Sequence, residues 1–262
     1  MTAGHIERAA TRLMRAAATS VACAPVRDLI ERDDLVAAYA VQTRVTAAHR
    51  VGGAQVTGRK IGLTSPAVQQ QLGVDRPDFG VLFDDMAYAD GAEVPISRFL
   101  QPRVEAEVAF VLGADLDDGP LDVEQVRGAV AYAVAALEIC DSRIERWDIT
   151  FADTVADNAS AGAYVLGSIH RSLAEFEPAN VSMSMDIDGV TVSRGTGAAC
   201  LGDPLNALAW LAVTAREFGD PLRAGQVVLS GALGPMVPVA AGARVTASLG
   251  ELGAIGVGFA AG

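Results

Sequence analysis

Two glutamates stand two residues apart in segment 103–111, which reads Arg-Val-Glu-Ala-Glu-Val-Ala-Phe-Val. Side chains two residues apart on a β-strand point to the same face, so Glu105 and Glu107 would lie side by side. The two anions repel each other, and each is costly to remove from water. Two interpretations follow: a strand face exposed to solvent with the apolar residues inside, or a pair of carboxylates held by a divalent cation.

A third carboxylate, Glu138, directly follows the apolar run 134–137. A lone charge there needs a partner, so Glu138 is a candidate third ligand; the alternative is a surface charge at the end of a helix. Oxygen ligands with no His or Cys nearby favour Mg²⁺ or Mn²⁺ over zinc. The sequence therefore leaves two interpretations of Glu105, Glu107 and Glu138. They form a Mg²⁺ or Mn²⁺ site, or they are carboxylates exposed to solvent.

The basic residues are divided unevenly, because 19 of the 20 are Arg and only Lys60 is Lys. A preference for Arg codons would explain the 19 arginines but not the exception. Arg keeps its proton in proteins, whereas a buried Lys can lose it. Lys60 is therefore the basic residue to consider for proton transfer.

Two polar segments are further candidates for ligand binding. Segment 153–162 is dense in short hydrogen-bonding side chains, and segment 229–235 is a strand that runs into a Gly-rich turn. Such segments bind ligands in some proteins and simply form turns in others. The N–H groups of a Gly-rich turn are also able to bind an anion.

Other catalytic chemistries have no support in the sequence. It contains no GxSxG motif and no GxxxxGK[ST] or strand-following GxGxxG loop. The three histidines stand in no recognisable context, which argues against Ser-His-Asp catalysis. Cys23, Cys140 and Cys200 are far apart and form no CxxC pair, so we predict reduced thiols rather than disulfides or a zinc-thiolate site.

Charge and hydropathy exclude two classes of partner. The formal net charge is −12, and the longest basic clusters are pairs such as Arg59-Lys60, which is too little for a nucleic-acid surface. Apolar runs are broken by charges or turns before ~18 residues, and the small-residue C-terminal stretch is broken by Gly. Segment 1–19 carries four charges and lacks the apolar centre of a signal peptide. We expect a cytoplasmic protein that binds neither nucleic acid nor membranes.

The elements that position these residues change in character near residue 55. The chain has 262 residues, 51% of them hydrophobic, which is enough for a sizeable core. Its first part predicts helices over 4–20 and 34–49. From residue 55, short strands dominate, at 55–63, 79–83, 104–112, 163–167, 181–194 (a hairpin around Asp188-Gly189), 226–230, 244–248 and 254–259.

We predict an α+β protein with two parts. The first is an N-terminal helical region, 1–54, and the second is a β-rich core, 55–262, which forms one integrated catalytic unit as a barrel or rolled sheet. Within this core, Ser65-Pro66 predicts a short helix over 66–72, and Asp203-Pro204 predicts a helix that ends at Gly219. A capping box at Asp122 predicts another helix, with a helical period that continues to Leu137 and a strand over 137–142.

Several long motifs in a fixed order resemble the 2-keto-4-pentenoate hydratase family, which belongs to the fumarylacetoacetate hydrolase superfamily. The first motifs are GRKIGLTS at 58–65, LGVDRPDFG at 72–80 and DDM at 84–86. The resemblance runs from about residue 35 to the C-terminus and continues through 103–107, 138–144, 153–162, 193–197, 201–206 and 230–237.

The resemblance implies a β-rich core of the fumarylacetoacetate hydrolase type and a Mg²⁺- or Mn²⁺-dependent enzyme of aromatic meta-cleavage degradation. It supports Glu105, Glu107 and Glu138 as metal ligands. It also implies a homo-oligomer, with a pathway decarboxylase or aldolase as a further partner. Segment 230–237, SGALGPMV, is similar to the hydratase branch of the family rather than to the 4-oxalocrotonate decarboxylases.

The reaction that the resemblance implies is hydration of 2-hydroxypenta-2,4-dienoate, or a close homologue, to 4-hydroxy-2-oxopentanoate. Lys60 is the expected proton-exchanging group, because burial and a nearby metal both lower the pKa of a Lys. Asp78 is expected to orient Lys60 or to act as a second acid-base. Ser160 and the Ser230-Gly231 turn are expected to bind the substrate carboxylate or the attacking water.

Three alternatives remain open. The first is decarboxylation of 2-oxo-3-hexenedioate with the same metal. The second is hydrolysis of a C–C bond in an acylpyruvate, which commonly uses a His–Glu pair to activate water, and no His here lies in a matching motif. The third is a non-catalytic protein that binds 2-oxo acids or supports another pathway enzyme.

Overall fold

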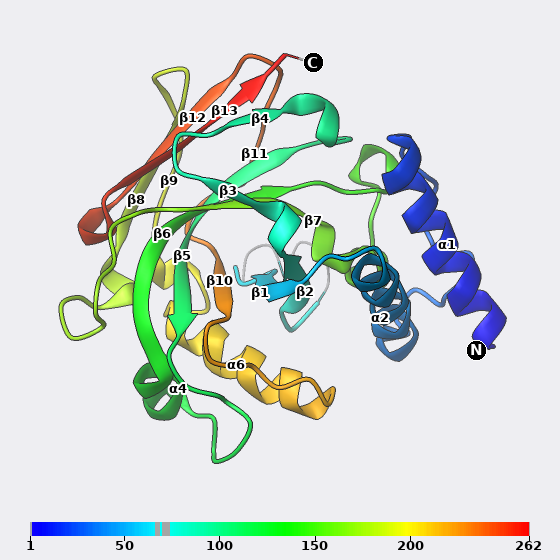
Figure 1. Ribbon diagram of the computed structural model, residues 1–262, viewed down its shortest axis with the longest axis horizontal. Coiled ribbons are helices and arrows are strands. Elements are labelled where there is room, and N and C mark those ends of the chain that lie inside the picture. Colours follow the sequence, from blue (N-terminus) through cyan, green and yellow to red (C-terminus); the bar gives the residue numbers. More distant parts are fainter. Residues whose placement is uncertain (1, 66–68, 70–73, 262) are drawn as a thin grey trace.

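The structure is a computed structural model, and it describes residues 2–65, 69 and 74–261. The helix expected over 66–72 lies outside these residues, apart from residue 69. The described chain forms two mixed sheets with helices around them, which confirms the α+β prediction (Figure 1). Among the described helices, none is both long enough and apolar enough to span a bilayer.

The larger sheet holds the elements that carry the candidate site. Its strand order is β2-β1-β10-β5-β6-β7-β3, and β11 pairs with β5. The bounds are Val56–Gly62 for β1, Asp78–Phe83 for β2, Ala87–Ala89 for β3, Arg103–Leu112 for β5, Val130–Cys140 for β6, Ala161–Leu166 for β7, Val227–Ala232 for β10 and Val237–Pro238 for β11.

The smaller sheet packs on the larger one through β13, which contacts β6 and β7. Its strand order is β4-β13-β12-β8-β9, and the hairpin predicted around Asp188-Gly189 joins β8 to β9. The bounds are Glu93–Pro95 for β4, Ser182–Ile187 for β8, Val190–Thr196 for β9, Arg244–Leu249 for β12 and Ala254–Ala260 for β13.

The first two helices lie together at one end of the molecule (Figure 1). Helix α1 (Ala3–Thr19) packs against α2 (Leu35–Val51), and α2 also contacts α5 (Phe151–Ala156). The Asp34 carboxylate caps α2 by accepting a hydrogen bond from Ala37 N–H. The division of the chain at residue 54, which falls between α2 and β1, stays a prediction.

The predicted helix after Asp122 is much shorter than expected. The Asp122 side chain does cap α4 by accepting from Gln125 N–H, but α4 ends at Ala129 and β6 begins at Val130. The predicted helical continuation to Leu137 is therefore wrong. Most of β6 is buried on both faces, so its sequence lacks the alternation that would distinguish a strand from a buried helix.

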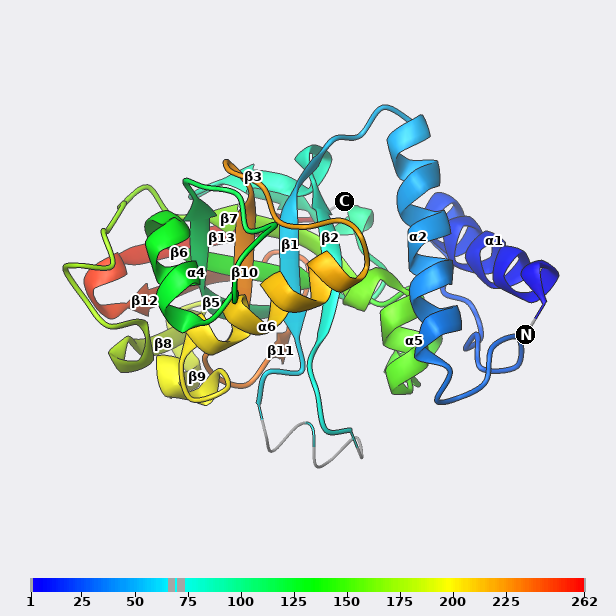
Figure 2. The ribbon, with the colours of Figure 1, turned by 90° about the horizontal axis from the view of Figure 1, so that it is seen from below.

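Helix α6 (Pro204–Glu217) lies across the larger sheet and packs on β10 (Figure 2). As predicted, the helix begins at Asp203-Pro204. The Asp203 carboxylate accepts a hydrogen bond from Leu205 N–H. Pro204 lies in the first turn, where backbone N–H groups make no hydrogen bond within the helix, so the N–H that proline lacks is not needed there.

A short segment after α5, Asn158–Ser160, is fastened to the edge of the larger sheet. All three of its residues have a positive φ, between 50° and 54°. The buried Asn158 amide donates to Val81 O at 2.9 Å and accepts from Val81 N–H at 2.8 Å. A Cβ at Gly80 would lie 2.4 Å from Asn158 O, so the close approach of the two segments requires glycine at that position.

We expect Asn158→Ala to lower the free energy of unfolding by about 2 to 4 kcal/mol, because it leaves two buried backbone groups of Val81 without partners. Chemical denaturation of the purified protein measures this loss. Asn180→Ala, at an exposed position, is the matched control and should change the stability by less than about 0.5 kcal/mol. Equal effects of the two variants would contradict the fastening role.

Candidate metal and substrate site

Five neighbouring strands bring the candidate residues to the middle of the larger sheet. Glu105 on β5 lies directly opposite Glu138 on β6, and Glu107 follows two residues later on the same face of β5. On the other side of β10, Lys60 lies on β1 opposite Gly80, and Asp78 starts β2 opposite Gly62. Residues separated by up to 78 positions in the sequence thus meet across adjacent strands.

The three glutamates are buried: Glu107 and Glu138 are 0% exposed, and Glu105 is 8% exposed. The two alternatives of a solvated strand face and a surface charge at a helix end are therefore wrong. Burial first, and then the neighbouring carboxylates, raise the pKa of Glu107 well above its usual value. Burial likewise raises the pKa of Glu138, although Lys60 opposes the shift.

Lys60 is buried, and its Nζ lies 2.9 Å from Glu138 Oε1. Its aliphatic chain passes over Gly80, where a Cβ would lie 3.2 Å from Lys60 Cδ. Burial favours a lower pKa, but the negative charges of Glu138, Glu105 and Asp78 outweigh it and raise the pKa of Lys60 well above its ordinary value. Without a metal ion, the pKa of Lys60 is therefore raised rather than lowered, because these carboxylates favour its ammonium form.

Asp78 lies beside this ion pair and is also buried. A Cβ at Gly62 would lie 2.2 Å from Asp78 Oδ1 and 3.5 Å from Lys60 Nζ, so the missing side chain of Gly62 makes room for both groups. Burial raises the pKa of Asp78 to about 6, and the charge of Lys60 opposes the shift. Asp78 is thus a carboxyl group that exchanges its proton close to neutral pH.

The Ser230-Gly231 turn forms a bulge in β10 opposite Glu107. Gly231 has φ of +112° and donates its N–H to Glu107 Oε2 at 2.7 Å. This N–H holds the glutamate in place and is therefore not free to bind a substrate anion. The hydroxyls of Ser230 and Ser160 are both buried and have no hydrogen-bond partner among the described residues, so each has a free donor.

The sequence interpretation missed Cys140, which lies next to the carboxylates. Its Sγ donates to Glu105 Oε1 at 3.6 Å, and the side chain is buried. Burial and the charges of Glu105 and Glu138 raise the pKa of this thiol well above its usual value. The expectation of an oxygen site with no Cys nearby is therefore wrong. Cys140 stands two residues after Glu138, so on a strand both side chains point to the same face. That spacing was the signal in the sequence that could have placed Cys140 beside the carboxylates.

The cluster fits a divalent cation. Four buried carboxylates, of Asp78, Glu105, Glu107 and Glu138, face one ammonium group, and such an excess of charge is costly without a counterion. Glu107 Oε1 and Glu138 Oε2 are buried and have no hydrogen-bond partner among the described residues. Carboxylate oxygens are the ligands that Mg²⁺ and Mn²⁺ prefer.

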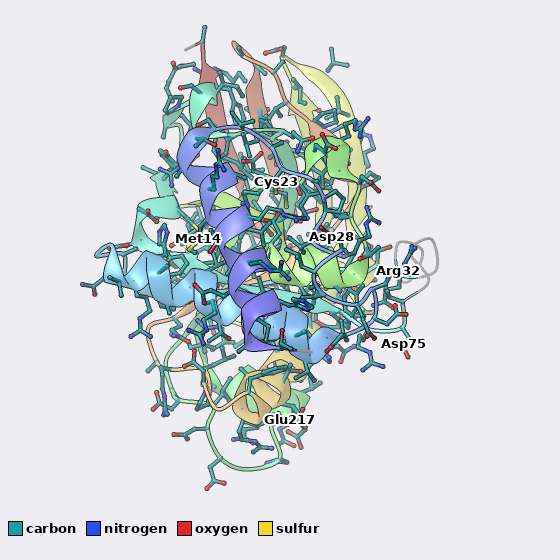
Figure 3. The ribbon with its side chains drawn as sticks, turned by 90° about the vertical axis from the view of Figure 1, so that its right-hand side faces the viewer. Met14, Cys23, Asp28, Arg32, Asp75 and Glu217 are labelled. Carbon is teal, nitrogen blue, oxygen red and sulfur yellow. The ribbon has the colours of Figure 1, made fainter. Side chains whose placement is uncertain are left out.

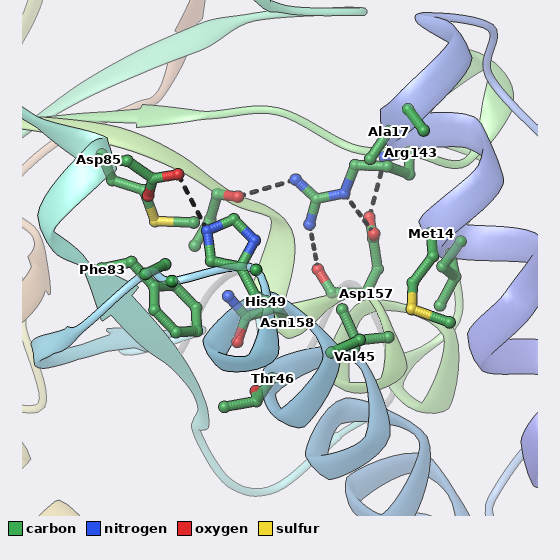
Figure 4. A pocket seen from close by; sticks show the side chains of 18 of the residues that line it. Met14, Ala17, Val45, Thr46, His49, Phe83, Asp85, Arg143, Asp157 and Asn158 are labelled. Atoms are coloured by element: carbon green, nitrogen blue, oxygen red, sulfur yellow. Dashed lines mark hydrogen bonds and ion pairs between the residues drawn. The ribbon is translucent and has the colours of Figure 1, made fainter.

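A cavity of about 830 Å³ lies away from this cluster, between the first two helices and the segments around Phe83 and Asn158 (Figure 4). Most of its lining is apolar. Its ionisable side chains already have partners: His49 Nε2 lies 2.9 Å from Asp85 Oδ2, Arg143 Nε lies 2.5 Å from Asp157 Oδ1, and Asp84 Oδ1 accepts from Gln55 N–H. The buried carboxylates, rather than this cavity, therefore carry the candidate chemistry.

Comparison with known proteins places the chain in a family. Residues 54–259 match the model of the fumarylacetoacetate (FAA) hydrolase C-terminal family. The chain belongs to this family. It is 52% identical to the TodF product hydratase of Pseudomonas putida strain F1, over 98% of this chain and 96% of that protein. It is 51% identical to the 2-keto-4-pentenoate hydratase of Burkholderia vietnamiensis strain G4, over 95% of each chain.

A solved structure shares the fold over nearly the whole chain. The 4-oxalocrotonate decarboxylase from Pseudomonas putida G7, complexed with magnesium and adipate, superimposes with a TM-score of 0.95 at 31% identity. The match covers 99% of this chain and 98% of that chain. The resemblance inferred from the sequence motifs is thus confirmed for both family and fold.

The raised carboxyl pKa values predict how metal and pH together affect stability. Without metal, the folded protein holds protons on Asp78, Glu107 and Glu138 that the unfolded chain releases above about pH 4. Stability therefore falls as the pH rises from about 4 through the folded pKa values, about 6 for Asp78. A divalent cation replaces those protons, so the increase in Tm on adding Mn²⁺ should be larger at about pH 8 than at about pH 5.

Differential scanning calorimetry of metal-free protein, with and without Mn²⁺ at both pH values, measures this difference. Glu138→Gln serves as the control and should reduce the metal-induced increase at about pH 8. An increase of equal size at both pH values would count against the metal acting through these carboxylates.

Proposed function

We propose that this protein is a metal-dependent 2-keto-4-pentenoate hydratase, a hydro-lyase of aromatic meta-cleavage catabolism. It adds water to 2-hydroxypenta-2,4-dienoate, or a close homologue, to give 4-hydroxy-2-oxopentanoate. The observation that carries the proposal is about 50% identity over nearly the whole chain to proteins named as hydratases, against 31% to the decarboxylase. The buried cluster of carboxylates supports it, because the reaction passes through an enolate that needs a positive charge.

Glu105, Glu107 and Glu138 are the proposed metal ligands, and Mg²⁺ or Mn²⁺ is the proposed ion. The bound cation supplies Lewis-acid stabilisation of negative charge on the 2-oxygen and the carboxylate of the substrate. Gly231 N–H keeps Glu107 turned toward the cluster. The free hydroxyls of Ser160 and Ser230 are proposed to donate to the substrate carboxylate or to the attacking water.

Two proton transfers are assigned to Lys60 and Asp78. In the first step the 2-hydroxyl loses its proton and C5 gains one, which gives the conjugated 2-oxo-3-enoate. In the second step water adds to C4, and C3 is protonated. Asp78, with a pKa of about 6, is able to accept and return a proton near neutral pH. Lys60, whose Nζ lies 2.9 Å from Glu138 Oε1, is the second group proposed to hold and transfer a proton.

The protein is proposed to form a homo-oligomer. A decarboxylase or an aldolase of the same pathway is proposed as a partner that supplies the substrate or removes the product. This part rests on the family resemblance alone.

The 4-oxalocrotonate decarboxylase is the second candidate function, because that structure superimposes over 99% of the chain. An ultraviolet assay of dienoate consumption, coupled to mass spectrometry of the product, distinguishes the two. A product heavier than 2-hydroxypenta-2,4-dienoate by one water is expected. Release of CO₂ from 2-oxo-3-hexenedioate, with no hydration of the dienoate, would overturn the proposal.

We expect Lys60→Arg to lower kcat by about 10²- to 10⁴-fold, because Arg keeps the charge and does not release its proton. Steady-state kinetics with Mn²⁺ measures the loss, and retained Mn²⁺ binding by the variant shows that the site is still folded. The matched control is Arg59→Lys, a residue of the same strand that pairs with Asp220 rather than with the cluster. Turnover of Lys60→Arg close to that of the unaltered enzyme would remove Lys60 from proton transfer.

A further inference from the structure

Cys140 gives the carboxylate cluster a sulfur atom that the proposed Mg²⁺ or Mn²⁺ site does not use. Cys140 and Glu138 lie two residues apart on β6, and Glu105 lies opposite Glu138 on β5. One ligand atom from each of these three buried side chains lies within 4.8 Å of the other two. Two oxygen donors and one sulfur donor therefore already surround a common point.

Two ligand atoms of this triad have few or no hydrogen-bond partners, although Glu138 Oε1 pairs with Lys60 Nζ at 2.9 Å. Glu138 Oε2 is fully buried with no hydrogen-bond partner among the described residues, and the thiol of Cys140 donates a hydrogen bond to Glu105 Oε1 at 3.6 Å. Donors around a tetrahedral ion at ~2.0–2.3 Å are roughly 3.5 Å apart, so these atoms need to approach one another by no more than roughly 1.5 Å.

Glu107 lies outside this triad. Its Oε2 is held by Gly231 N–H on the other flank of β5. The cluster thus contains two overlapping sets of donors that share Glu105 and Glu138. One set is completed by the oxygen of Glu107, and the other by the sulfur of Cys140.

Hard cations such as Mg²⁺ and Mn²⁺ prefer the oxygen set, whereas sulfur donors select softer ions. We propose that Glu105, Glu138 and Cys140 form a second metal-binding mode that takes Zn²⁺ or Cd²⁺ in place of the catalytic ion. On binding, the sulfur coordinates as a thiolate and its proton passes to the solvent. Because two carboxylates are shared, the soft ion displaces Mn²⁺ and so inhibits the enzyme.

The inference uses the metal site of the proposed function, but its test requires neither substrate nor turnover. Metal-free full-length protein is titrated with CdCl₂ while the sulfur-to-cadmium charge-transfer absorption is recorded in the ultraviolet. One equivalent of Cd²⁺ should give the full band, and the same equivalent should release Mn²⁺ from Mn²⁺-loaded protein, as followed by electron paramagnetic resonance. A failed hydration assay would leave both readouts unchanged.

Variants separate the two donor sets. Cys140→Ser should abolish the band and weaken Cd²⁺ binding by at least about tenfold, with Mn²⁺ binding retained. Glu107→Gln should keep the band but weaken Mn²⁺ binding, whereas Glu138→Gln should weaken both. Cys23→Ser and Cys200→Ser are the matched thiol controls and should keep the band; Cys23 lies beside α1, on the side of the molecule shown in Figure 3.

Several results would overturn the proposal. The first is the absence of a band in the unaltered protein, and the second is a band that forms without release of Mn²⁺. A band that persists in Cys140→Ser, or that is lost in Cys23→Ser or Cys200→Ser, would place the ion on a different thiol. If Cys140→Ser does not fold, the contrast between Glu107→Gln and Glu138→Gln decides, and equal loss of the band in both contradicts the triad.

Discussion

An excess of buried negative charge is the constraint on which the rest of this site depends. Four carboxylates and one ammonium group share the middle of the larger sheet, where removal from water is costly for each of them. Sequences rarely keep such an arrangement for stability, because apolar residues of similar size would serve a sheet interior as well. The divalent cation proposed for this site would offset the cost, and such a cation would also stabilise the enolate of the proposed reaction.

The surrounding structure holds these charges apart and in place. Adjacent strands fix the spacing between Glu105 and Glu138, and the bulge at Gly231 turns an N–H toward Glu107. Glycines at 62 and 80 leave room for Asp78 and for the chain of Lys60. Because all of these groups lie on strands with a fixed register, the site is organised before any ligand arrives.

The sequence predicted the parts of this site that depend on local pattern. The spacing of Glu105 and Glu107 predicted a shared strand face, and the single Lys among the basic residues drew attention to Lys60. Pattern alone did not decide whether that face was buried, because a polar alternation also describes a solvated strand. On the carboxylate side of β5 and β6, Ala109 and Ala136 pack with residues of β2, β7 and β10, which are long-range contacts within the larger sheet that no local window contains.

The helix predicted to continue past Ala129 and the missed position of Cys140 share this origin. The apolar run after Ala129 has both a helical period and the composition of a buried strand, and only its pairing with β5 decides between them. The pKa of Lys60 in the protein without metal depends on carboxylates from β2, β5 and β6 as well as on burial, and the lowered pKa expected next to a metal stays a prediction. Cys140 was missed because its partner Glu105 is 35 residues away in the sequence.

We infer that the buried carboxylates hold one divalent cation. X-ray diffraction from crystals of the Mn²⁺-loaded protein, collected at the manganese absorption edge, tests it most directly. We expect one anomalous peak per chain, within bonding distance of Glu105, Glu107 and Glu138. A peak bound elsewhere, or no peak with Lys60 still paired to Glu138, would contradict it.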